Sequence, residues 1–344
     1  MGLYVRSTLP VAPLSHIVAP VALGEYDRLS EKLVLTYDNT AFNDAAGAQL
    51  QRIYGIYSVS RLLGASYLHT PLGRIGYQGL SALEEGILDP DFNREFNELL
   101  PIESDVLPTD DFHEVKVRDL TLEAVEQLVA QFDNGATGGR PTLARVVLPY
   151  LIADAFPDCY EVCKAISPFE SSVDEDRVLR VALHVRRGEI FANAADRLLP
   201  NSFYVNAAHA VADVLEGLGR EFQIELWTEL PTKEFAIRPD DDIFNQLESP
   251  VMLNADMSAI EDFDELPNLV PRINGSAIDC LRGLATADVL LMSRSSFSYV
   301  SGLLNKNCVA MLHPFWHRAP SSWIEVGFEG QFDRLVFEQA VAAL

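Results

Sequence analysis

Positive charge is scarce in this chain of 344 residues. It has 26 Lys and Arg residues against 50 Asp and Glu residues, which gives a formal net charge of −24. Surfaces that bind nucleic acid or anionic membranes need an extended basic face, and so few cations can hardly assemble one. The composition therefore argues against both classes of partner, and any anion site in this chain has to be local.

Cysteine and long apolar runs are also in short supply. The four cysteines form one C-x3-C pair, Cys159 and Cys163, and two singletons. This is neither a zinc-ligand pattern nor a disulfide framework, so we expect buried thiols.

No run reaches the roughly 18 to 20 apolar residues of a membrane span. The apolar segment 1–27 is broken by prolines and lacks the basic start of a signal peptide. We therefore expect a cytoplasmic protein.

What the sequence does have is a repeated alternation of strand-like and helix-like apolar patterns, typical of α/β folds with parallel sheets. Its length and 48% hydrophobic content predict two domains. The polar stretch 168–177 marks the boundary, giving an N-terminal α/β domain at 1–172 and a C-terminal α/β domain at 173–344. We expect a closing helix at 334–344 that docks on the N-terminal domain.

The pattern in the first half predicts strands at 32–37 and 65–70 and helices at 49–64, 121–131 and 142–165. In the second half it predicts strands at 178–185, 222–228, 268–273, 288–293 and 308–312, and helices at 203–218, 275–286 and 296–304. The second succession is that of an independently wound α/β domain.

Two adjacent arginines follow a buried strand in VALHVRRGEI, residues 181–190. Ligands of an open parallel sheet gather at the carboxyl ends of its strands, and a guanidinium matches phosphate oxygens two at a time. Arg186 and Arg187 point to opposite sides of an extended segment, so we expect one to face a phosphate while the other pairs with a carboxylate. The alternative is that both arginines only form salt bridges.

A hydroxyl-rich turn lies within 276–312, between a buried strand and a helix. It contains Ser293, Ser295, Ser296 and Ser298, with Arg294 among them. Hydroxyls and free N–H groups at a helix N-terminus bind anions, reinforced by the helix dipole. A simple serine N-cap is the alternative, but one cap does not need so many hydroxyls. Together with the double arginine, the turn favours a phosphate site.

These two stretches, HVRRGE and ADVLLMSRSSFSYVSGLL, resemble the donor-binding domain of the fucosyltransferase superfamily that includes the α1,2-, α1,6- and protein O-fucosyltransferases. Its members share an H-x-R-R-x-[DE] element and a later Asp, strand, Ser-rich turn and helix. NDAAGAQLQRIYGIYSVSRLLGASYLH resembles the family's early G-x-x-x-Q-L segment, and LPNSFYVNAAHAV resembles another family stretch. The similarity touches both halves of the chain.

The resemblance implies two Rossmann-like domains facing a cleft, the GT-B arrangement. The implied activity is inverting, metal-independent transfer of fucose from GDP-fucose to a hydroxyl of a glycan, protein or small glycoside. No cofactor beyond this donor is implied. Arg186 would stabilise the charge on the departing GDP, with Glu189 as the second catalytic residue. The implied donor-binding residues are His184, Arg187, Asp279, Arg294, Ser295, Ser296 and Phe297, with Asp279 accepting hydrogen bonds from guanine.

The general base stays open among Glu189, Asp196, Asp44 and Glu229. Glu189 stands where the family commonly has Asp, and Glu229 also suits ribose binding. Acceptor or cleft candidates are Asp44, Gln49, His69, Tyr77 and Glu229. His69 and Tyr77 have flat faces with polar tips that suit a sugar, and core packing is the alternative.

Carboxylates at D-x-D spacing in 238–244 and 261–266 arise easily in a chain this acidic, so we expect no metal site. Trp316 and His317 are expected to pack between the last strand and the last helix. There are two alternative functions. The protein could be a glycosyltransferase that uses another nucleotide sugar, or a catalytically silent protein that binds a nucleotide sugar.

Overall fold

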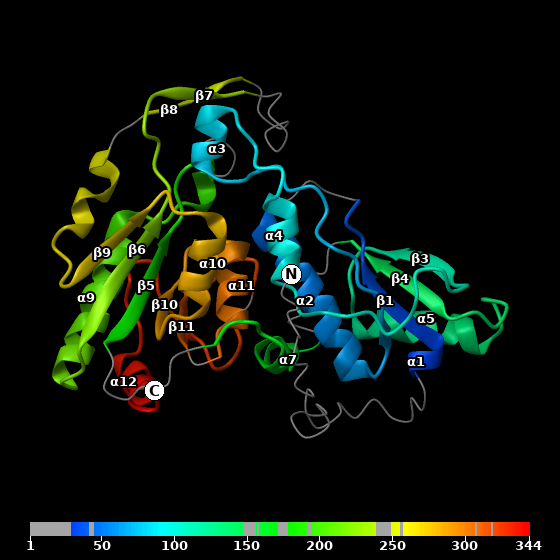
Figure 1. Cartoon of the computed structure of the whole chain (residues 1–344). Helices are drawn as coiled ribbons and strands as arrows, with labels where there is room; N and C mark the ends of the chain where they lie inside the picture. The colour runs from blue at the N-terminus through cyan, green and yellow to red at the C-terminus, as the bar shows by residue number, and fades with distance from the viewer. Residues whose placement is uncertain are drawn as a thin grey trace, which may run out of the picture.

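The computed structural model describes residues 29–40, 45–147, 156, 158–170, 178–190, 195–238, 249–254, 257–306, 308–317 and 319–344. Two parallel sheets stand on either side of a layer of helices that includes α2, α7, α10 and α11 (Figure 1). The predicted α/β class with two parallel-sheet halves is confirmed. The predicted domain boundary at 172/173 lies outside the described residues, but the two sheets fall on either side of it.

The N-terminal sheet has the order β2-β1-β4-β3, with every neighbour parallel. Its strands are β1 Leu33–Tyr37, β2 Ser66–Tyr67, β3 His113–Val117 and β4 Thr142–Val146. The helices of this half are α1 Leu29–Lys32, α2 Ala46–Leu63, α3 Leu80–Glu85, α4 Phe92–Glu98, α5 Leu122–Asp133 and α7 Cys159–Ala165.

The C-terminal sheet has the order β12-β11-β10-β5-β6-β9, again all parallel. Its strands are β5 Leu179–Val185, β6 Phe222–Thr228, β9 Leu269–Ile273, β10 Val289–Leu291, β11 Val309–Leu312 and β12 Ile324–Glu325. Counted in chain order, the six strands lie as 3-2-1-4-5-6, which is the doubly wound Rossmann order. The topological switch point therefore lies between β5 and β10.

Helices cover both faces of this sheet. They are α9 Asn201–Gly217, α10 Ala277–Ala285, α11 Ser296–Leu304 and α12 Arg334–Ala342, with 3-10 turns η2 Ala195–Arg197 and η4 Met257–Phe263. An antiparallel hairpin of β7 Phe235–Ile237 and β8 Val251–Leu253 lies beside α3 of the other half (Figure 1). No helix in the described part of the chain is long and apolar enough to span a bilayer.

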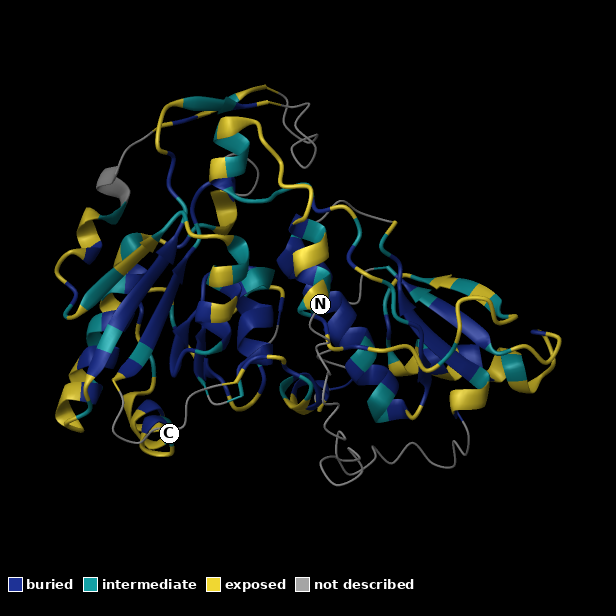
Figure 2. Ribbon diagram, viewed as in Figure 1, coloured by how far each residue is buried: buried dark blue, intermediate teal, exposed yellow. Residues whose placement is uncertain are grey.

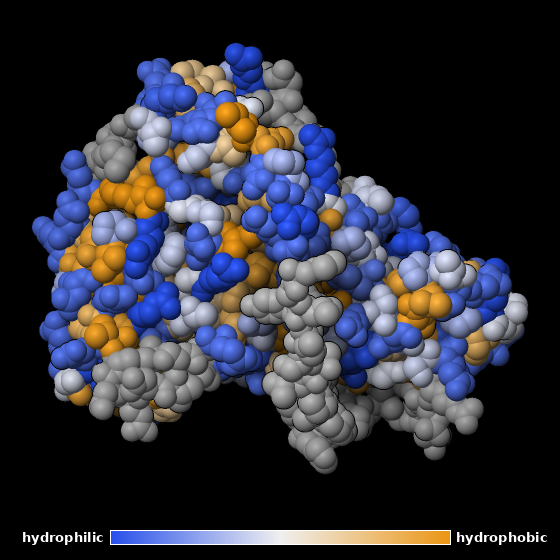
Figure 3. Space-filling view, viewed as in Figure 1, coloured by the Kyte–Doolittle hydropathy of each residue, from blue (hydrophilic) through white to orange (hydrophobic). Residues whose placement is uncertain are grey.

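One apolar core runs through both halves. It joins residues of β1, α2 and α7 to residues of α10 and α11, and Figure 2 shows both sheets and these central helices as largely buried. A hydrogen bond of 2.7 Å links the hydroxyls of Tyr160 on α7 and Tyr299 on α11. A second core lies on the other face of the C-terminal sheet, under α9 and α12. The halves are therefore fused by apolar packing, and mostly hydrophilic residues cover the face seen in Figure 3.

Two sequence predictions are wrong in the fold. The segment predicted as a helix at 142–165 begins as strand β4 and ends as helix α7. A short continuous apolar run looks the same in a central strand as in a buried helix, because both are covered on all sides. The closing helix α12 packs on α9 and β11 of its own half, through Phe337 and Val341, and not on the N-terminal half.

Candidate functional site

The carboxyl ends of β5 and β10 lie side by side, because Leu183 of β5 pairs with Leu291 of β10. From β5 the chain leads to α9 on one face of the sheet, and from β10 it leads to α11 on the other. Such a divergence opens the crevice in which doubly wound sheets bind their ligands. The double arginine and the serine-rich turn both fall at this point.

Arg186 bridges the two strand ends. Its Nη1 donates to Ser295 Oγ at 2.8 Å, and its Nη2 pairs with the carboxylate of Glu189, which is only 2% exposed. The Nε of Arg186 is buried and has no hydrogen-bond partner among the described residues. The structure thus brings Arg186, Glu189 and Ser295 together, and Nε is the guanidinium nitrogen left without a partner among the described residues. Their role toward phosphate stays a prediction.

Ser295 is the N-cap of α11, and its Oγ also accepts from the Phe297 N–H at 3.2 Å. The first turn of α11 carries no acidic residue, so its dipole is not neutralised there. Ser293 and Ser298 hydrogen-bond to each other at 3.3 Å, and Ser298 also donates to the carbonyls of Ser293 and Ser295. These two hydroxyls therefore shape the turn and leave Ser295 as the one that meets Arg186.

His184, the penultimate residue of β5, is a buried neutral side chain. Its Nδ1 hydrogen-bonds to Ser293 Oγ at 3.0 Å, and its ring lies tilted against Phe297 with centroids 5.9 Å apart. Burial and the nearby positive charge of Arg186 lower the pKa of His184 to about 3. His184 therefore joins the two strand ends without adding charge.

Arg187 and Arg294 extend the positive charge of this edge. Arg187 donates to the Arg186 carbonyl at 2.9 Å and to Asn201 Oδ1, and lies over the Tyr204 ring. Arg294 donates to His313 Nε2 at 2.8 Å, and its Nε is buried without a hydrogen-bond partner among the described residues. Neither forms an ion pair with a carboxylate in the described part of the chain.

The sequence predicted that one of the two arginines pairs with a carboxylate, without fixing which one. In the structure it is Arg186, because Glu189 follows the Gly188 turn and returns to Arg186, whereas Arg187 is turned toward α9. Of the three arginines at this edge, only Arg186 forms an ion pair with a carboxylate among the described residues, and Glu229 on the same edge is held by the neutral donors Tyr77 and Leu80. This local surplus of positive charge fits an anion.

The N-terminal half reaches the same edge through Tyr77. Its hydroxyl donates to Glu229 Oε2 at 2.9 Å, and the Leu80 N–H donates to Glu229 Oε1 at 3.0 Å. Burial and the neighbouring charge of Glu189 raise the pKa of Glu229 above its usual value. Burial and Glu229 likewise raise the pKa of Tyr77. Two predicted cleft residues from different halves of the chain are therefore in direct contact.

Other predicted site residues lie elsewhere. Asp279 is exposed at the start of α10, where its backbone N–H donates to the N-cap Ser276 Oγ at 3.1 Å and its carboxylate accepts from the same hydroxyl. Gln49 accepts from the Gly73 N–H at 2.8 Å and donates to the Arg74 carbonyl, which fixes that loop. His69 follows β2, with its backbone N–H bonded to Ser104. Asp44 lies outside the described residues.

His317 is a site neighbour that the sequence reasoning missed. Its Nε2 lies 3.0 Å from Ser296 Oγ and its Nδ1 lies 3.1 Å from Gln51 Nε2, so it links α11 to α2. Burial, reinforced by the charges of Arg52 and Arg197, lowers the pKa of His317 to about 3. No sequence signal marks this contact, since Gln51 lies on a distant segment. The predicted packing of Trp316 between the last strand and the last helix is wrong. This residue is 44% exposed and its ring lies beneath the guanidinium of Arg197.

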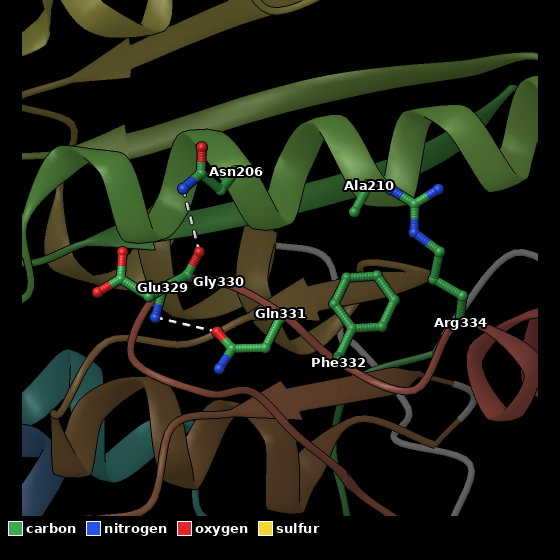
Figure 4. Close-up of a pocket in the computed structure, with 7 residues that line it drawn as sticks. All are labelled: Asn206, Ala210, Glu329, Gly330, Gln331, Phe332 and Arg334. Atoms are coloured by element: carbon green, nitrogen blue, oxygen red, sulfur yellow. Dashed lines mark hydrogen bonds between the residues drawn. The ribbon is translucent and has the colours of Figure 1, made fainter.

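A pocket of about 310 Å³ lies between α9 and the segment before α12 (Figure 4). It is lined by Asn206, Ala210, Glu329, Gly330, Gln331, Phe332 and Arg334. None of the predicted site residues lines it. No group of three or more His, Cys, Asp or Glu side chains comes together to hold a metal within the described residues, and the acidic run at 240–242 lies outside them.

Comparison with known proteins gives little guidance. No protein-family model and no curated protein matches the sequence. Two solved structures of the E. coli heptosyltransferase WaaC are similar, one with ADP-2-deoxy-2-fluoro heptose and one with ADP. Each is 9% identical and covers 91% of this chain and 99% of its own, with TM-scores of 0.35 and 0.37. TM-scores this low do not establish a shared fold, so the strand order and the contacts above carry the argument.

Proposed function

We propose that this protein is an inverting, metal-independent glycosyltransferase that uses a nucleoside-diphosphate sugar, with GDP-fucose as the donor. The observation that carries the proposal is Arg186, which bridges the ends of β5 and β10 at the switch point and keeps a buried Nε without a partner among the described residues. A diphosphate placed there would meet the guanidinium, Ser295 and the N-terminus of α11. The choice of fucose rests on the sequence resemblance, and another nucleotide sugar is the nearest alternative.

The chemistry follows from where charge develops. Glycosyl transfer leaves negative charge on the departing nucleoside diphosphate, and fixed cationic donors stabilise that charge. Arg186 supplies this positive charge, with Arg187 and Arg294 adding to the field. Glu189 acts as a positioning residue, since its buried carboxylate holds one guanidinium nitrogen of Arg186 while another donates to Ser295. A guanidinium thereby takes the place of a divalent cation.

The test is calorimetric binding of GDP, UDP and ADP to the wild type and to Arg186→Ala. We expect the preferred nucleotide to bind the variant about 10- to 100-fold more weakly, because a hydrogen bond to a charged group is lost. Arg334→Ala is the matched control, since Arg334 pairs with Asp213 on the far side of α9 and lines no part of the site. Equal affinity in Arg186→Ala would reject the proposed clamp.

A turnover assay distinguishes an active glycosyltransferase from a protein that only binds the nucleotide sugar. The carboxylates of Glu189 and Glu229 are already hydrogen-bonded, Glu189 to Arg186 and Glu229 to Tyr77 and Leu80, which favours a silent nucleotide-sugar-binding protein as the second candidate. The assay measures release of GDP from GDP-fucose in the presence of glycan, protein and glycoside acceptors. It is repeated with EDTA to remove divalent cations. Transfer that survives EDTA supports the metal-free enzyme. Binding without release on any acceptor supports the silent protein.

A further inference from the structure

Glu229 occupies a defined place in the Rossmann order. It is the first residue after β6, the second strand of the 3-2-1-4-5-6 sheet, and the pairing of Val185 with Thr228 sets it level with Arg186. In dinucleotide-binding sheets of this order an acidic residue beyond the phosphate-binding turn accepts hydrogen bonds from the ribose hydroxyls. A nucleotide whose diphosphate lies at Arg186 would bring its ribose toward this neighbouring strand end.

The two carboxylate oxygens of Glu229 are held by two neutral donors. Oε2 accepts from the Tyr77 hydroxyl and Oε1 from the Leu80 N–H, at 2.9 and 3.0 Å. No ion pair joins Glu229 to a cation among the described residues, although Glu189 on the same edge has one. One donor to each oxygen is also the pattern that a ribose 2′,3′-diol presents to a carboxylate.

Tyr77 also lies over the phosphate-binding turn. A Cβ added at Gly188, whose φ is +70°, would come within 3.3 Å of the Tyr77 hydroxyl and 3.7 Å of Glu229 Cβ. The hydroxyl therefore sits between the 186–189 turn and Glu229, on the path from the expected diphosphate to the carboxylate. A ribose hydroxyl that reaches Oε2 from the 186–189 turn would compete with the Tyr77 hydroxyl for this position.

We propose that Glu229 binds the ribose diol of the donor nucleotide, and that the Tyr77 hydroxyl occupies part of the diol's position until the nucleotide displaces it, while the Leu80 N–H stays on Oε1. This inference rests on the proposed function. It makes the site selective for ribonucleotides over 2′-deoxyribonucleotides. It also makes donor binding compete with a contact between the two halves of the chain.

A second attachment keeps the displaced segment near the site. Glu84 of α3 accepts hydrogen bonds from the Thr232 hydroxyl and from the Thr232 N–H, at 2.6 and 2.5 Å. Leu80 and Leu83 pack against Ile237 and Leu253 of the β7–β8 hairpin. Tyr77 stands outside α3, so its side chain can leave Glu229 while α3 stays on the hairpin.

The experiment compares GDP, UDP and ADP, each with its 2′-deoxy counterpart, on the wild type, Glu229→Gln and Tyr77→Phe. We expect the wild type to prefer the ribonucleotide about 10-fold, and Glu229→Gln to lose most of that preference, since a bond to a charged acceptor is involved. Tyr77→Phe removes the competing donor, so its affinity for the ribonucleotide should rise about 2- to 10-fold. Tyr57→Phe and Glu98→Gln, both remote from the site, are the matched controls.

The outcomes separate the two proposals. An unchanged ribose preference in Glu229→Gln, with a far-ultraviolet circular dichroism spectrum like that of the wild type, overturns the inference. Unchanged or weaker ribonucleotide binding in Tyr77→Phe overturns the competition. If Arg186→Ala still weakens nucleotide binding in either case, the proposed function stands without this inference. If the wild type binds none of the three nucleotides, both fail together.

Discussion

At the scale of single residues, the switch point is held by contacts between segments far apart in the chain. Arg186 and Ser295 are 109 residues apart and hydrogen-bond there, each beyond the carboxyl end of its strand, where ligands of parallel sheets gather. This shared edge could be predicted from the sequence. The partner of each guanidinium was not predictable in the same way. Glu189 returns to Arg186 because Gly188 adopts a φ of +70°. A glycine in the sequence permits this turn but does not require it.

His317 gives the residue-scale prediction. Its pKa of about 3 lies below the value near 6.5 of an exposed histidine, so only the unfolded chain takes up its proton between these limits. The unfolded state then binds more protons, and the free energy of unfolding falls as the pH falls through this window. His317→Asn should remove a slope of about 1.4 kcal/mol per pH unit between pH 6 and pH 4.

Urea unfolding of His317→Asn and of the wild type at several pH values in that range measures the difference. The slope that comes from the equally buried His184 should stay in both proteins. Loss of packing lowers the stability of the variant at every pH, so the slope is the informative quantity. Parallel pH profiles would show that His317 takes up its proton as easily in the folded chain as in the unfolded one.

Strands and helices were predicted best where their apolar residues recur with a clear strand or helix period. The strands 222–228 and 269–273 and the helix 296–304 lie within a residue of their expected positions. β3, in contrast, is an edge strand with sequence HEVKV, half exposed along its length, and its polar side chains conceal its strand character. The contact of α3 with the β7–β8 hairpin also had no signal, because it joins a short helix to a distant hairpin.

The crossing of α2 and α11 gives the element-scale prediction. A Cβ added at Gly47 of α2 would lie 2.5 Å from Phe297 Cα and 2.6 Å from Phe297 N. Both atoms belong to the backbone of α11 and cannot rotate away. Gly47→Ala should therefore push the helices apart and lower the free energy of unfolding by about 1–3 kcal/mol. It should also weaken nucleotide binding, since Ser295 moves with Phe297.

The matched control is Gly217→Ala at the end of α9, where an added Cβ meets nothing within 4 Å. Its stability should stay within about 0.5 kcal/mol of the wild type. Chemical denaturation and calorimetry with the preferred nucleotide measure both effects. A Gly47→Ala protein as stable as the Gly217→Ala protein would mean that α2 and α11 do not approach this closely.

At the scale of the molecule, the two halves share one core, and this decides how the chain unfolds. Apolar residues of α2 and α7 pack directly on those of α10 and α11, and the Tyr160–Tyr299 and Tyr77–Glu229 hydrogen bonds cross the same boundary. Domains joined through small polar interfaces move and unfold separately, whereas a large apolar interface couples them. We therefore expect the described halves to unfold in a single transition.

The positions of the tryptophans make this testable, because Trp227, Trp316 and Trp323 all belong to the C-terminal half. Their fluorescence reports the C-terminal half and, through Trp323 against Tyr160 of α7, its contact with the other half. Far-ultraviolet circular dichroism reports the helices of both halves. In urea the two signals should change together in the wild type, with equal midpoints. In Gly47→Ala they should separate, with the circular dichroism changing first, because the N-terminal half then loses the packing of α2 on α11. Separate midpoints in the wild type would refute the shared core as the unit of unfolding.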